Sequence, residues 1–140
     1  MDDAELRRSA APGSLQEDSI FQSLARRARP GERPEELLFD LGLIDEQDFA
    51  LELAGRAGRP FTGLRGFMPD LRLFVYLPLP IALRERVCPL VLVGGSLKLA
   101  TAFLDPDLSH LARCPSLQQE LVVAPRREIL EALNRVADAL

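Results

Sequence analysis

The chain has 140 residues, of which 47% are apolar and 27% charged, and its formal net charge at pH 7 is −4. This length suits one domain with its own hydrophobic core, and the acidic balance excludes a general nucleic-acid binder, which needs a basic face to offset phosphates. No apolar run reaches the roughly 18 residues of a membrane-spanning helix. Because the N-terminus MDDAELRRSA also lacks the apolar segment of a secretory signal, we expect a cytoplasmic protein.

The N-terminal part of the chain is predicted to be an arm followed by helices. Residues 1–16 are rich in Ala, Ser, Gly and charge without a sustained apolar face, which is typical of a flexible arm. Apolar residues then recur at helical spacing over 20–28, until prolines and a glycine interrupt the pattern. We therefore assign residues 17–58 to a helical subdomain and residues 59–140 to an α/β subdomain.

The stretch 34–58 is predicted to form two helices joined by a tight corner. Pro34 suits a first helical turn. Gly42 suits the left-handed position after a helix end, because it lacks the Cβ that makes this conformation costly. Asp45 is a good N-cap for a second helix, which then runs to Gly58.

The second half of the chain has the pattern of a small sheet packed with helices. Its clearest signal is CPLVLVGGSLKLATAF, residues 88–103, in which two apolar runs flank Gly94-Gly95. Two glycines are a composition that a type I′ hairpin turn accepts. The other expected elements are a strand at 61–64, helices at 80–86 and 105–111, a strand at 121–124 and a last helix from Pro125. The expected fold is α+β, in the order α-α-α-β-α-β-β-α-β-α, with a mainly antiparallel sheet of three or four strands.

No group of residues in the sequence has the pattern of an active site. His110 is the only histidine, which excludes a multi-histidine metal site. The stretch GGSLK at 94–98 lacks the spacing of a phosphate-binding loop. Cys88 and Cys114 are isolated thiols, which we interpret as small packing side chains in a reducing compartment. We therefore expect no catalytic residue, no metal and no enzymatic activity.

Two surface features have two interpretations each. Arginines gather before the predicted corner, at Arg26, Arg27, Arg29 and Arg33. They form either a solvated basic face or a site for an acidic partner or an anion. The proline-rich apolar stretch 71–80 either covers the sheet or forms a docking surface. Both features are hypotheses for interaction surfaces rather than for catalysis.

Residues 33–137 resemble the N-terminal domain of the assembly ATPases of type II secretion and type IV pili. The resembling pieces are ELLFDLGLIDEQDFALELAGRAGRPF (36–61), LPLPIALRERVCPLVLVGGSLKLATAFLDP (77–106) and APRREILEALNRV (124–136). In that family the ATPase activity lies in a separate C-terminal domain. The resemblance therefore implies a non-catalytic module that docks a protein partner, either a membrane-platform or a signalling component. Its protein-interaction residues would be Arg26, Arg29 and Arg33.

The resemblance also implies an alternative function, that of a cyclic di-GMP sensor. Some members of the family bind this nucleotide through two tandem motifs. The second motif keeps Arg33 and Gly42 in this chain, but Arg56 stands where the family has a closing glutamine. The first motif likewise ends in an arginine, Arg27. The ligand-binding residues of this alternative are thus Arg27, Arg33, Gly42 and Arg56.

One departure from the motif bears directly on ligand binding. Pro34-Glu35 replaces a Leu-Gly pair, and a glutamate adds bulk and negative charge where backbone N–H groups would approach phosphates. We therefore expect no bound cofactor, with cyclic di-GMP as the alternative ligand. A third hypothesis is that residues 1–140 are the head of a larger protein, since the last helical pattern reaches Leu140.

Overall fold

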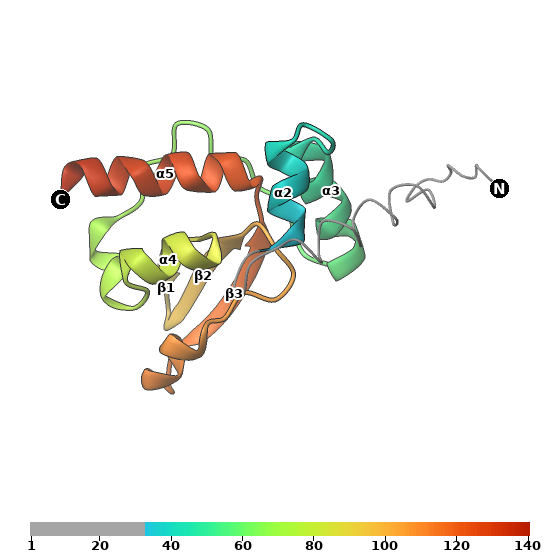
Figure 1. Ribbon diagram of the computed structural model, residues 1–140. Helices are drawn as coiled ribbons and strands as arrows, with labels where there is room; N and C mark the ends of the chain where they lie inside the picture. Colours follow the sequence, from blue (N-terminus) through green and yellow to red (C-terminus); the bar gives the residue numbers. More distant parts are fainter. Residues whose placement is uncertain (1–32) are drawn as a thin grey trace. The chain divides into compact units, whose positions relative to one another are not determined.

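A computed structural model describes residues 33–140 of the chain (Figure 1). The predicted arm at 1–16 and the predicted helix at 20–28 lie outside the described residues. The chain divides into two compact units, residues 1–45 and residues 46–140. The described part combines helices with a three-stranded sheet, so the expected α+β class is confirmed.

Helix α2 (Pro34–Asp40) lies in the described part of the first unit, residues 33–45, and begins at the expected proline. It ends at Asp40, and Gly42 follows the C-cap residue Leu41 in a left-handed conformation, with a φ of +72°. The N–H of Gly42 donates to the Phe39 carbonyl at 3.0 Å, and the N–H of Leu43 donates to the Leu38 carbonyl at 3.0 Å. These two bonds define a Schellman helix end. The predicted role of Gly42 as the residue that terminates the helix is confirmed.

The second unit contains one long helix at each end and a sheet between them. Its elements are α3 (Glu46–Ala57), the 3-10 helix η1 (Leu71–Val75), α4 (Leu79–Glu85), β1 (Val87–Val93), β2 (Ser96–Thr101), the 3-10 helix η2 (Ser109–Arg113), β3 (Gln118–Val123) and α5 (Arg126–Ala139). Helix α3 begins at the residue after Asp45, and α4 and α5 begin within one residue of the positions expected for them. The predicted hairpin is also present as β1 and β2.

The sheet has the order β1-β2-β3 and is mixed rather than mainly antiparallel. Strands β1 and β2 are antiparallel and joined at Gly94-Gly95, whose φ values of +58° and +80° fit a type I′ turn. Strand β3 runs parallel to β2, from Ser96 opposite Gln118 to Thr101 opposite Val123. The long connection through η2 returns the chain to the hairpin end of the sheet. As a result, β3 starts beside the start of β2.

Two expected elements take a different form in the structure. The strand at 61–64 is reduced to a single parallel bridge between Phe61 and Val123, because the N–H of Leu64 bonds to the Glu128 side chain instead of a strand. The short helix expected at 105–111 is the 3-10 helix η2, displaced by a few residues along the chain.

Helix α5 buries one face against the sheet. Ile129, Leu133 and Val136 recur at the helical spacing of three to four residues and are fully buried, and α5 contacts both β1 and β2. The middle strand β2 contributes Leu97 and Leu99 to the same core. Burying each of these side chains contributes roughly 1.5–3 kcal/mol to folding. The last helix expected from Pro125 is confirmed.

The proline-rich stretch 71–80 fulfils only part of its expected covering role. Leu73 and Leu77 are buried, and η1 contacts β1. Leu71 and Val75 are exposed on the same short helix. The stretch therefore covers the core with alternate side chains and leaves the others in solvent.

Candidate functional site

The structure describes three of the four residues predicted to bind a ligand. Arg33 is the extended N-cap residue of α2, and Gly42 follows the end of that helix. The seven-residue helix between them is about 10 Å long. Arg56 lies in the last turn of α3 and forms an exposed ion pair with Glu52, one turn earlier. Arg27 lies outside the described residues, as do Arg26 and Arg29.

The local structure explains two features of the altered motif. A Cβ placed on Gly42 would meet nothing within 4 Å, so glycine is needed there for its backbone conformation rather than for space. Glu35 lies in the first turn of α2, where the helix dipole favours an acid. The residue that replaces the family's glycine thus stabilises a helix start, and the binding role of Arg33, Gly42 and Arg56 stays a prediction.

Glu46 and Arg126 form an ion pair that links α3 to α5 within the second unit. Arg126 Nε donates to Glu46 Oε1 at 3.0 Å, and Nη2 donates to Oε2 at 3.1 Å. The two side chains, Arg126 and Glu46, are only 12% and 13% exposed. Paired N–H···O bonds between arginine and a carboxylate are strong and geometrically specific. No local sequence pattern marks Glu46 for this role, since its partner lies 80 residues along the chain.

Two further carboxylates, on helices α4 and α5, accept hydrogen bonds from the backbone of connecting segments. Glu85, which is buried, accepts a hydrogen bond from the N–H of Asp107 at 2.7 Å. Glu128 accepts one from the N–H of Leu64, also at 2.7 Å. Hydrogen bonds to a charged group contribute about 1.5–3 kcal/mol each. These carboxylates therefore have structural roles.

The shifted pKa values have structural causes. Burial raises the pKa of the Cys88 thiol to about 12, so Cys88 stays protonated at neutral pH and is not a nucleophile. Hydrogen bonds from the Arg72 side chain and N–H lower the pKa of Asp70. Hydrogen bonds from Ser109 lower the pKa of Asp107. These three pKa shifts therefore do not mark a pair of side chains that could act as general acid and general base.

The ionisable side chains of residues 33–140 do not form a metal site. This part of the chain contains no group of three or more His, Cys, Asp or Glu side chains placed to hold a metal ion. None of its helices is both long enough and apolar enough to cross a membrane.

Comparison with known proteins places these features in a family. The model of the MshEN domain family matches residues 57–140, more than half of the chain. A structure of MshE with cdg is 26% identical at a TM-score of 0.58, with 86% of this chain and 88% of that chain covered. Two crystal forms of the N-terminal domain of XpsE are also 26% identical, with TM-scores of 0.61 and 0.63. They cover 95% of this chain and 91% and 90% of their own. A search of curated proteins found no match.

Proposed function

Because the chain belongs to the MshEN domain family, the N-terminal domain type of type II secretion and type IV pilus ATPases, we propose that it is a non-catalytic protein-interaction module. In this role it docks a partner of the secretion, pilus or motility machinery in the cytoplasm. The partner is a membrane-platform or signalling component. The domain supplies a surface, and the chemistry belongs to other proteins or domains.

One observation supports this proposal above the others. The buried charged side chains of the second unit are engaged in holding the fold together, through the Glu46–Arg126 pair and the Glu85 hydrogen bond to Asp107. A catalytic site needs buried or partly buried groups that remain available to a substrate. In the second unit the buried charged side chains bind other parts of the same unit, and other charged side chains are exposed to solvent. This arrangement suits a docking role.

We propose that the partner contacts the basic cluster of Arg26, Arg29 and Arg33. Arg33 is the described member, at the start of α2 and half-exposed. Arginine suits such contacts because its planar guanidinium binds carboxylates through two parallel hydrogen bonds.

A pull-down from the native cell tests this proposal. The wild-type chain should recover a specific partner from the secretion or pilus machinery, and Arg33→Glu should lose it. Arg113→Glu is a matched control, since Arg113 is an exposed arginine on η2 and should leave recovery unchanged. Recovery of the same partners by the wild type and both variants would count against this contact, and recovery of no specific partner by the wild type would count against the function.

A second function, cyclic di-GMP sensing, is favoured by the likeness to MshE, which has been solved with cdg. We propose that the Gly42 corner keeps the frame of the motif, and that Arg27, Arg33 and Arg56 meet the phosphates or stack on the guanines. Isothermal calorimetry with cyclic di-GMP tests this function. Saturable heat at roughly tens of micromolar ligand, lost in Arg33→Ala, would support it. The absence of heat would exclude it at that affinity.

A further inference from the structure

The loop after the Phe61 bridge is fastened to α5 at two points. The N–H of Leu64 donates to Glu128 Oε1 at 2.7 Å. Arg135 Nη1 donates to the carbonyl of Phe67, also at 2.7 Å. Glu128 and Arg135 lie two helical turns apart, on the same side of α5. The loop therefore follows α5 as a fixed part of the surface (Figure 1).

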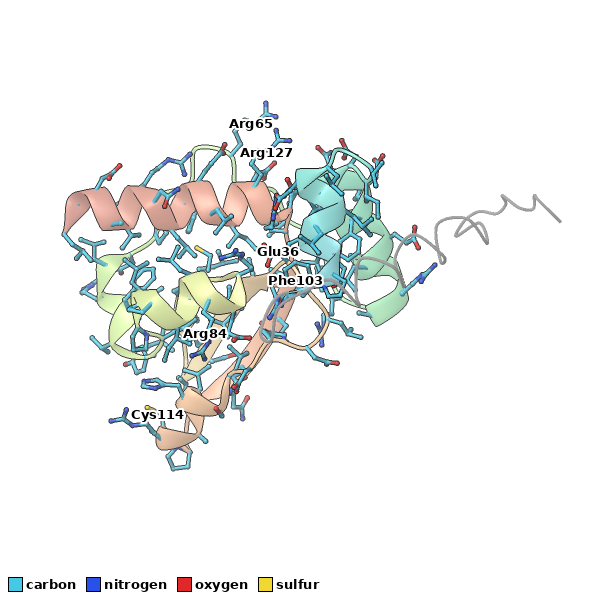
Figure 2. The ribbon with its side chains drawn as sticks, in the orientation of Figure 1. Glu36, Arg65, Arg84, Phe103, Cys114 and Arg127 are labelled. Carbon is cyan, nitrogen blue, oxygen red and sulfur yellow. The ribbon has the colours of Figure 1, made fainter. Side chains whose placement is uncertain are left out.

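This fastening places Arg65 beside Arg127 on the surface (Figure 2). Arg65 follows Leu64 and Arg127 precedes Glu128, so the two arginines flank the hydrogen bond between the loop and the helix. Both side chains are exposed. Within residues 33–140, neither has a hydrogen bond or an ion pair. Two positive charges thus lie together without internal compensation.

Most other basic side chains of the second unit have partners. Those bonded to a carboxylate or a carbonyl are Arg56, Arg59, Arg72, Arg84, Arg86, Lys98, Arg126 and Arg135. In the described part of this unit, the exceptions are Arg65, Arg127 and the separate Arg113 on η2. Two of the three uncompensated arginines therefore come from different elements and meet at one place.

The position of Arg127 is electrostatically unfavourable in the isolated domain. It lies in the first turn of α5, where the helix dipole disfavours a cation. Its neighbour Arg126 is compensated by Glu46. Glu131, one turn further along α5, forms no ion pair with Arg127. A charged side chain that lies in an unfavourable electrostatic position and has no ion-pair partner is typical of a binding surface.

We propose that Arg65 and Arg127 form a docking point for an acidic segment of a partner protein. This inference rests on the proposed interaction function and names a surface for it. Each guanidinium binds one carboxylate through two parallel hydrogen bonds, so two glutamate or aspartate side chains complete the site. Two arginines suit nucleic acid poorly, because its affinity for a protein depends on the number of phosphates that basic side chains neutralise. Two arginines are also too few for an anionic membrane, which is recognised by clusters of about four to eight basic residues.

Titration of the 15N-labelled 140-residue chain with an N-acetylated, C-amidated hexaglutamate peptide tests the site. The Nε–H signals of Arg65 and Arg127 should shift together and saturate at low ionic strength. The variant Arg65→Ala/Arg127→Ala should bind the peptide at least about tenfold more weakly. Arg113→Ala removes the other uncompensated arginine and should bind within about twofold of wild type. Equal weakening by both variants would overturn the proposal.

Two further measurements distinguish this docking point from a general anion site and from a pair of structural arginines. Inorganic phosphate and phosphatidylglycerol vesicles should shift these signals less than the peptide does, and a preference for either anion would overturn the acidic-segment assignment. Arg127→Glu should unfold thermally at or above the wild-type temperature, because an acid suits the first turn of α5. A lower temperature would show that Arg127 is structural. A chain that recovers its cellular partner yet fails to bind hexaglutamate would reject this surface alone and leave the proposed function intact.

Discussion

Glu46 and Arg126 lie 80 residues apart in the sequence and meet in a two-bond ion pair that is nearly buried. The pair joins the first turn of α3 to the first residue of α5. Mutual attraction offsets the cost of removing the two charges from water only while both partners are present. The pair is therefore a point at which two distant helices depend on each other.

Removal of one partner of this pair should destabilise the second unit strongly. Arg126→Met leaves the Glu46 carboxylate largely buried without a cation, and we expect a loss of about 3 kcal/mol in the free energy of unfolding. The double variant Glu46→Met/Arg126→Met should regain most of that loss, because the Glu46 carboxylate is no longer left nearly buried without its cation. Urea unfolding of the three proteins measures both effects. A double variant as unstable as the single one would contradict this account.

Gly42 and Gly55 should respond to alanine in opposite directions. Gly42→Ala forces a Cβ into the left-handed conformation at φ +72° and should cost about 1 kcal/mol. Gly55 lies inside α3, and a Cβ there meets nothing within 4 Å. Gly55→Ala should therefore stabilise by up to about 1 kcal/mol. Denaturant unfolding gives both values, and a change of the same sign in both variants would be inconsistent with the helix end at 42.

The buried thiol of Cys88 should make stability fall at alkaline pH. Its pKa is raised from 9.0 to about 12 by burial, so the native state holds its proton while the unfolded chain loses it. Stability from this group is complete below about pH 9 and is lost as the pH rises towards 12, at up to about 1.4 kcal/mol per unit. Cys88→Ala should have a shallower slope in urea unfolding between about pH 8 and 10. Equal slopes would show that Cys88 does not contribute.

The Glu128 carboxylate should hold the loop that follows α5 in its place on the helix. Glu128→Ala leaves the buried N–H of Leu64 without its acceptor, at a cost of about 1–3 kcal/mol. Hydrogen exchange at the Leu64 amide should accelerate, while the amides of β2 should exchange more slowly than Leu64 does. Glu128→Gln keeps a carbonyl acceptor and is the conservative control. Slow exchange at Leu64 in Glu128→Ala would show that another group holds the loop.

Locally determined features were predictable from the sequence. The helix end at Gly42 and the hairpin turn at Gly94-Gly95 depend on backbone conformations that favour glycine, so the residue type indicates the structure directly. The core face of α5 follows from the spacing of Ile129, Leu133 and Val136, which repeats with the period of a helix.

Features that depend on distant partners were not predictable. The sequence of β3 does not show whether it lies parallel or antiparallel to β2, because the connection through η2 decides its direction. The partners of Glu46 and Leu64 lie 80 and 64 residues away, and no local pattern marks these pairs. The pairing of Arg65 with Arg127 on one surface has the same origin, since the Leu64–Glu128 bond brings them together.

Photo-crosslinking in the native cell tests the central claim of partner docking most directly. A benzoylphenylalanine placed at Arg33 should crosslink to one component of the secretion, pilus or motility machinery. The same group at Arg113, on η2, should give no such product. Identification of the crosslinked protein by mass spectrometry decides the result. A product at 33 that contains a machinery component supports docking. The absence of any specific product at 33, or the same products at both positions, would contradict it.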